Sequence, residues 1–169
     1  MIDENIRYVV YGIPATAGSK KGFYNPKTKR VNMVDTCKRK GPWMQQVALA
    51  AAEAMKGRPP LAQAVKVSMH FVFARPKSHR NSKGDLRKGK SVEHISKPDL
   101  TKLVRCAEDA MKGIVWNDDS QVAIQQNSKA WGVENLAIIV IEPLTATPGN
   151  GLPSTPAGTE ASHAPNPTN

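Results

Sequence analysis

The chain has 169 residues, with 24 lysines and arginines against 14 aspartates and glutamates, which gives a formal net charge of +10. This length suits one domain with a proper hydrophobic core, and the charge suits a polyanionic partner, since basic side chains release counterions from phosphates. An integral membrane protein and a secreted one are excluded, because no apolar run approaches the ~20 residues of a membrane span and the first residues lack the regions of a signal peptide; we expect a cytoplasmic protein.

The N-terminal part predicts a strand followed by a basic hairpin. Ile6–Ile13 is rich in β-branched and aromatic residues and stops at a proline, which is typical of a strand. Phe23–Tyr24 can pair with residues 30–34 across a turn. Lys20 and Lys21 open this basic segment, which either contacts phosphates or forms a solvated loop.

A helix and a second strand come next. Asp35 or Thr36 can cap a helix that runs to about Lys56, where Gly57 and two prolines end it. Ala64–Ala74 alternates apolar and polar residues, which predicts a strand with one dry face.

Residues 75–97 form a long polar loop with many more basic than acidic side chains. A loop of this length is uncommon in a compact domain unless it is functional or disordered. We expect a flexible phosphate clamp that orders on DNA, with a solvated loop as the alternative. The candidate contacts with DNA are Arg75, Lys77, Arg80 and Lys97.

The segment from Lys97 to Val122 organises the chain. Pro98 suits the first helical position and Asp99 the first turn, and apolar residues at helical spacing extend the helix to about Lys112. Gly113 suits the position after the helix, and residues 117–119 predict a turn that leads into a strand. Cys106 on this helix is expected to be half-buried, and it and Cys37 show neither a zinc motif nor a disulfide framework.

Three acidic residues of this segment are candidate metal ligands. The expected helix is roughly 20 Å long, and a strand that returns along it can carry Asp118 and Asp119 towards it. Only certain packings set them beside Asp99. Carboxylates that share a small volume favour a cation, and hard oxygen ligands suit Mg²⁺ or Mn²⁺. Each acid taken alone is typical of a helix N-terminus or of a turn.

The C-terminal part predicts one more strand and a tail. Asn135–Ile141 is continuously apolar, which is typical of a central strand. Residues 143–169 contain six of the 13 prolines and almost no bulky apolar residue, which predicts disorder. We therefore expect one α/β domain over residues 1–142 and a disordered tail over residues 143–169.

The stretches KPDLTKL and EDAMKGIVWNDDSQV resemble the RusA family of phage and bacterial Holliday junction resolvases. The resemblance implies a small mixed sheet packed with two main helices, a homodimer, and Mg²⁺-dependent cleavage of four-way DNA junctions, without a small-molecule cofactor. The setting it implies is DNA recombination and repair in a bacterial or phage-infected cell. By position, Asp99 matches the first essential aspartate of the family and Asp119 the later one, with Asp118 beside it.

Two further positions follow from the resemblance. Arg105 lies where the family has a basic residue, and with Lys102 it would neutralise charge on the scissile phosphate. The family commonly has a second aspartate where this chain has Thr101. The candidates to replace that carboxylate are Glu93, His94, Glu108 and Asp109. The alternatives are a branched-DNA-binding protein whose cleavage is weak or lost because of Thr101, and a basic interaction protein with an incidental acidic turn.

Overall fold

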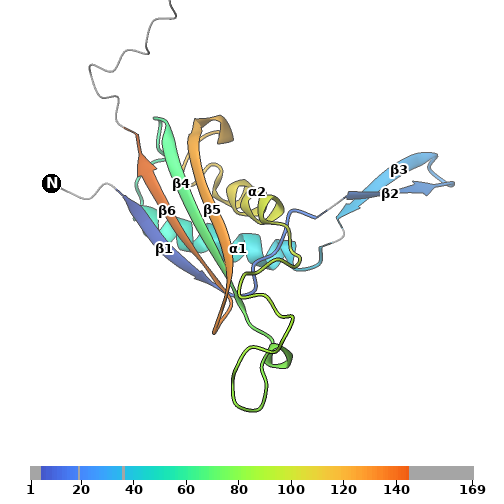
Figure 1. The fold of residues 1–169 in the computed structure, drawn as a ribbon. Helices are drawn as coiled ribbons and strands as arrows, with labels where there is room; N and C mark the ends of the chain where they lie inside the picture. Colours follow the sequence, from blue (N-terminus) through green and yellow to red (C-terminus); the bar gives the residue numbers. More distant parts are fainter. Residues whose placement is uncertain (1–4, 19, 36, 145–169) are drawn as a thin grey trace, which may run out of the picture.

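The computed structural model describes residues 5–18, 20–35 and 37–144. Two α-helices and six strands lie in these residues (Figure 1). In chain order they are β1 (Ile6–Tyr11), β2 (Lys20–Asn25), β3 (Arg30–Asp35), α1 (Lys40–Met55), β4 (Val65–Ala74), α2 (Leu100–Met111), β5 (Val122–Gly132) and β6 (Leu136–Pro143). Two single turns of 3₁₀ helix, Lys77–His79 and Asp119–Gln121, lie in the loops on either side of α2.

The main sheet is mixed, as predicted, with strand order β1-β6-β4-β5. β6 pairs antiparallel with both β1 and β4, which confirms that this continuously apolar strand is central. β4 and β5 are parallel, and the segment that joins them contains the long loop and α2. β5 is therefore an edge strand, with one backbone edge free of strand partners among the described residues.

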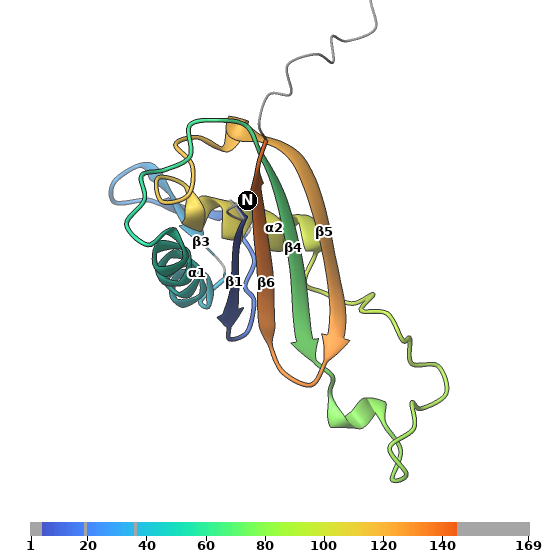
Figure 2. The same cartoon turned by 90° about the vertical axis from the view of Figure 1, so that its left-hand side faces the viewer.

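Both helices cover the same face of this sheet, where they pack against each other (Figure 2). The dry face predicted for β4 is confirmed, because Val65, Val67 and Phe71 are fully buried while the intervening residues are only half-buried. Burial of one such side chain contributes about 1.5–3 kcal/mol, so this alternation fixes which face the helices cover. Neither described helix is long and apolar enough to cross a membrane.

The start of α1 differs from the prediction. Asp35 is the last residue of β3 and does not cap the helix, because an extended strand residue five positions before the helix is too far along the chain. Arg39 occupies the N-cap without a side-chain hydrogen bond. Thr36, the other predicted cap, lies outside the described residues. The C-terminal end is as expected, with Gly57 at a φ of +74° just after the helix.

The predicted hairpin is also confirmed. β2 and β3 form a separate two-stranded antiparallel sheet that projects away from the main body (Figure 1). At the other end of the chain, Pro143 belongs to β6, and the Leu144 N–H donates to the Ala64 carbonyl at 2.8 Å. Pro143 and Leu144, predicted to belong to the disordered tail, are therefore part of the described fold, and the rest of the predicted tail, residues 145–169, lies outside the described residues.

Candidate metal and nucleic-acid site

Helix α2 positions the candidate acids. Its buried face includes Leu103, Ala107 and Met111, which recur at helical spacing and hold the helix against the sheet and α1. The helix begins at Leu100, two residues after the predicted first position at Pro98, because Asp99 is the N-cap in an extended conformation. Gly113 has a φ of +77°, as predicted for the residue after the helix.

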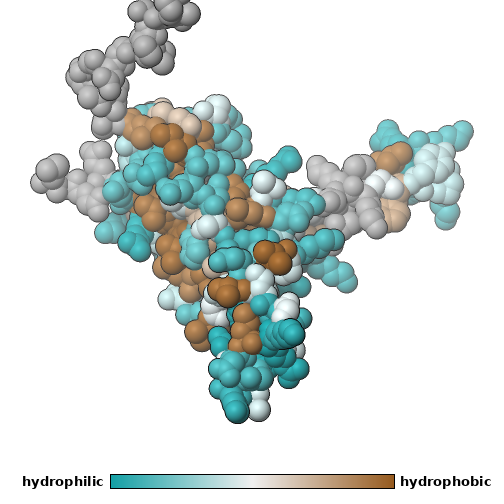
Figure 3. All heavy atoms as spheres, in the orientation of Figure 1, coloured by the Kyte–Doolittle hydropathy of each residue, from teal (hydrophilic) through white to brown (hydrophobic). Residues whose placement is uncertain are grey.

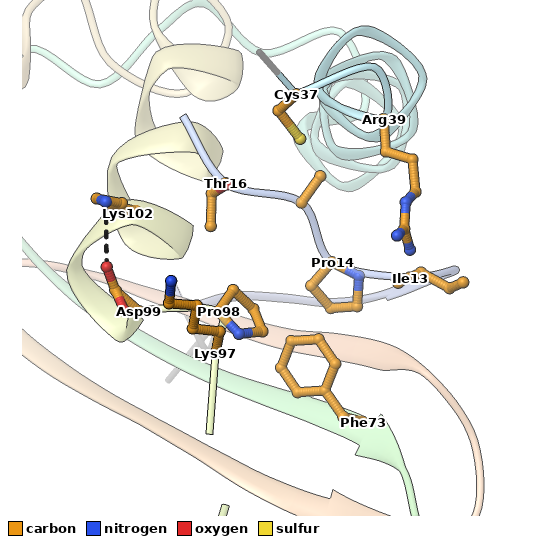
Figure 4. Close-up of a pocket in the computed structure, with 11 residues that line it drawn as sticks. Ile13, Pro14, Thr16, Cys37, Arg39, Phe73, Lys97, Pro98, Asp99 and Lys102 are labelled. Atoms are coloured by element: carbon orange, nitrogen blue, oxygen red, sulfur yellow. Dashed lines mark ion pairs between the residues drawn. The ribbon is translucent and has the colours of Figure 1, made fainter. Parts of the chain in front are cut away.

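Asp99 lies at the N-terminal end of α2, where its side chain is half-exposed and forms an ion pair with Lys102 at 3.1 Å (Figure 4). Beside it is a pocket of about 490 Å³. Its apolar wall includes Pro14, Phe73 and Pro98, and its charged rim consists of Arg39, Lys97, Asp99 and Lys102. Positive charge therefore surrounds Asp99, the one carboxylate among the described residues that line this pocket.

Asp118 lies beyond the other end of α2, where it caps the turn that leads into β5. Its Oδ1 accepts from the Ser120 N–H at 3.0 Å, and Gln121 Oε1 accepts from the Asp118 N–H at 3.0 Å. Lys112 Nζ lies 2.7 Å from Asp118 Oδ2. The hydrogen bond from Lys112, followed by those from Ser120, holds the pKa of Asp118 well below its usual range.

Asp119 is oriented by the core. The indole Nε1 of Trp116, which is fully buried, donates to Asp119 Oδ1 at 3.2 Å. Lys112 Nζ is 3.8 Å from the other oxygen. Glu108 approaches from the last full turn of α2 and accepts a hydrogen bond from Gln125 on β5. Burial raises the pKa of Glu108 above its ordinary value, and the nearby charges of Asp119 and Asp109 raise it further.

The two acidic ends of α2 are separate within one chain. β5 runs antiparallel to the helix: Gln125 meets Glu108 near its C-terminal end, and Lys129 donates to the Pro98 carbonyl at 2.8 Å near its N-terminal end. The 12 residues of α2 span roughly 18 Å. One chain therefore does not place Asp99 beside Asp118 and Asp119, and no three His, Cys, Asp or Glu residues form a metal-ligating group within the described ranges.

The donors at the C-terminal end of α2 nevertheless fit part of a Mg²⁺ site. Glu108 and Asp119 offer carboxylate oxygens, which are the ligands that this ion prefers. Burial and, after it, the charge of Asp119 raise the pKa of Glu108, and a divalent cation would relieve the repulsion between the two carboxylates. Glu108 was only one of four candidates to replace the carboxylate missing at Thr101, because the sequence alone does not show that it faces Asp119.

His94, another of those four candidates, lies buried at the base of the loop 75–97. It is 5% exposed and stacks on Trp131 with ring centroids 3.9 Å apart. The edge of His79 meets the same indole, and the Arg75 guanidinium lies 5.4 Å from its centre. The base of the loop 75–97 is thus folded around Trp131, which corrects the expectation of a wholly flexible clamp. Burial lowers the pKa of His94 below its ordinary value.

The predicted DNA contacts fall into four groups. Arg105 is exposed on α2 between the two acidic ends, while Lys97 and Lys102 line the pocket beside Asp99. Arg75 donates to the carbonyls of Ser91 and Val92, so its guanidinium holds the loop. Lys77 and Arg80 are exposed farther along the loop. The side chains of Lys20 and Lys21, on β2, lie outside the described structure.

A comparison with protein-family profiles identifies the family. The profile of the family described as Endodeoxyribonuclease RusA matches residues 14–142. The chain is also similar to a Bacillus subtilis (strain 168) protein, Uncharacterized protein YqaN, with 32% identity over 145 residues that cover 83% of this chain and 98% of that protein. The chain therefore belongs to the RusA endodeoxyribonuclease family.

Proposed function

We propose that this protein is a Mg²⁺-dependent endodeoxyribonuclease that cuts four-way DNA junctions as a homodimer, with each acidic site shared between two copies. The observation that carries this proposal is the division of the acids between opposite ends of α2, beside an edge strand that runs antiparallel to the helix. Neither end alone has a full set of metal ligands among the described residues. A second copy of the chain would supply the metal ligands that each end lacks.

The edge strand β5 provides the geometry for this sharing. Residues 123–126 are exposed on both faces of the strand, and Ile124 is 48% exposed. A two-fold axis through the middle of β5 would pair it antiparallel with the same strand of a second copy. The start of one β5, with Asp119, would then lie beside the end of the other, where Lys129 holds the segment that leads into Asp99. Two such sites would arise, related by symmetry.

Each residue of the shared site then has a proposed role in binding the metal ion or the phosphate. Glu108 and Asp119 of one copy and Asp99 of the other would hold Mg²⁺, with Asp118 kept ionised beside them by Lys112. When bound, the ion supplies an activated water and stabilises the charge that develops on phosphate oxygens. Arg105, exposed between the acidic ends, and Lys102, exposed beside Asp99, would bind the scissile phosphate. Mn²⁺ has similar ligand preferences and is expected to substitute.

Cleavage of a synthetic four-way junction in a Mg²⁺ and Mn²⁺ titration tests this function. Asp99→Asn and Asp119→Asn should each abolish cutting while junction binding persists, because each removes a ligand and leaves the basic surface intact. Asp85→Asn is the matched control, since Asp85 is an exposed acid in the loop away from both ends of α2. Cutting that survives in both site variants would contradict the proposal.

A branched-DNA-binding protein with weak or no cleavage is the second candidate, and one observation favours it. Thr101 is exposed in the first turn of α2, so Asp99 has a cation, Lys102, and no second carboxylate beside it. Binding without cutting at any concentration of either metal would favour this candidate. Thr101→Asp separates the two, because a gain of cleavage would show that the missing charge limits the reaction.

A further inference from the structure

The β2–β3 hairpin carries apolar surface that the rest of the described chain does not cover. Its two strands pair with each other and have no extensive contact with the main sheet or helices. Phe23 is 57% exposed, Tyr24 64% and Val31 60%. Figure 3 shows hydrophobic surface, in brown, on the projecting hairpin at the right of the view. An isolated two-stranded hairpin is marginally stable in water, and exposed aromatic residues on it indicate a binding surface.

The two aromatic rings lie on opposite faces of the hairpin. Phe23 and Tyr24 are adjacent on β2, and side chains of adjacent strand residues point to opposite faces. Tyr24 is paired with Val31, so the tyrosine ring shares its face of the hairpin with an apolar neighbour. The hairpin therefore presents one aromatic ring on each of its two faces.

The turn that joins the strands is closed by a side-chain hydrogen bond and is positively charged. The Asn25 side chain accepts from the backbone N–H of Lys27 at 3.0 Å and orders the turn. Lys27, Lys29 and Arg30 are exposed at this end, and the segment from Lys20 to Val34 contains no aspartate or glutamate. Positive charge around exposed rings complements a nucleic acid, since cations bind phosphates while rings stack on bases.

We propose that this hairpin is a wedge that stacks Phe23 and Tyr24 on base pairs at the branch point of the DNA, and so distinguishes branched from continuous DNA. The inference rests on the proposed function for its substrate class, branched DNA. Base-pair faces at a branch point are less completely stacked than those within a duplex, so a ring inserts there at a lower cost. Apolar side chains that open base steps in continuous DNA must first offset the unstacking energy.

Binding without divalent metal tests the wedge separately from cleavage. Fluorescence anisotropy in EDTA compares a labelled four-way junction with a linear duplex of the same sequence. Phe23→Ala and Tyr24→Ala should each weaken junction binding about tenfold, as expected for the loss of one stacked base, and leave duplex binding unchanged. Tyr24→Phe should retain junction binding. Because the hairpin makes no extensive contact with the other described elements, the variants are expected to keep the thermal unfolding transition of the parent protein.

Matched controls identify what the rings contact. Tyr11→Ala removes a tyrosine that is equally exposed, 64%, but lies on the main sheet, and it should change neither affinity. Lys29→Ala should weaken junction and duplex binding alike. Equal losses on both DNAs for Phe23→Ala and Tyr24→Ala, or no loss, would overturn the wedge. Dissociation of the dimer in these variants, seen by sedimentation, would overturn it in favour of a second copy as the partner. A chain that binds junctions as described but never cuts them would contradict the proposed function and leave the wedge standing.

Discussion

The hydrogen bond between Trp116 and Asp119 offers a sharp test of how the core orients the site. Trp116→Phe keeps most of the buried apolar surface but removes the indole N–H that donates to Asp119 Oδ1 at 3.2 Å. The smaller ring leaves a cavity of roughly 40 Å³, which costs about 1 kcal/mol. Loss of a hydrogen bond to a charged acceptor adds about 1–2 kcal/mol, taken at the lower end because the Asp119 side chain is 43% exposed.

We therefore expect Trp116→Phe to lower the free energy of unfolding by about 2–3 kcal/mol, which for a chain of this size corresponds to a fall of about 5–10 °C in melting temperature. Trp43→Phe is a matched control, because Trp43 is also buried, 2% exposed, and its Nε1 has no hydrogen-bond partner among the described residues. This control should lose only the cavity contribution of about 1 kcal/mol.

The same pair of variants also separates positioning from folding. Trp116→Phe should lower the cleavage rate about 10- to 100-fold with little change in DNA affinity, since a freed carboxylate is a poorer metal ligand. Trp43→Phe should cut at the parent rate under conditions where both variants are folded. Equal stability losses in the two variants, or equal cleavage rates, would refute the claim that Trp116 orients Asp119.

Two further predictions concern ionisable groups. Burial raises the pKa of Glu108 above its unfolded value of 4.5, so the stability that its protonated form contributes is full below pH 4.5 and is lost as the pH rises through the raised pKa. Glu108→Gln should therefore be more stable than the parent protein at neutral pH in EDTA. The same variant should lose the rise in melting temperature that Mg²⁺ gives the parent, whereas the control Asp109→Asn should keep it. Burial lowers the pKa of His94, so the folding stability should be full above pH 6.5 and should fall as the pH drops through the lowered pKa. The free energy of unfolding of His94→Phe, measured in urea, should depend less steeply on pH than that of the parent, with a residual slope from His79, whose pKa is also lowered. A slope equal to that of the parent would contradict this prediction.

The spacing of apolar residues predicted most helices and strands, because each spacing follows from the burial of one face of a helix or strand. The alternation along β4 and the apolar stripe on α2 follow directly from burial of one face. The unbroken apolar run of β6 indicated a central strand for the same reason. The prediction that Asp35 caps α1 was wrong because Asp35 continues β3, where its pairing with Lys20 of β2 overrides the local preference for a cap.

The arrangement of the site could not be predicted in the same way. Asp99 and Asp119 are joined by one helix and one turn, but the direction of β5 against α2 is set by its parallel pairing with β4. That pairing returns the chain antiparallel to the helix and leaves the acids at opposite ends. Likewise, His94 in a loop rich in lysine has no sequence signal of burial, because its stacking depends on Trp131, 37 positions later in the chain.

The shared site is tested most directly by mixing two variants that are each inactive. Asp99→Asn and Asp119→Asn chains are unfolded together, refolded to allow exchange, and assayed for nicking of a four-way junction in Mg²⁺. If each site takes Asp99 from one copy and Asp119 from the other, every mixed dimer has one intact site. Random mixing makes half of the dimers mixed, so about a quarter of the parent sites return. Recovery of nicking to that level is the predicted result, and a mixture as inactive as either variant alone would contradict the account.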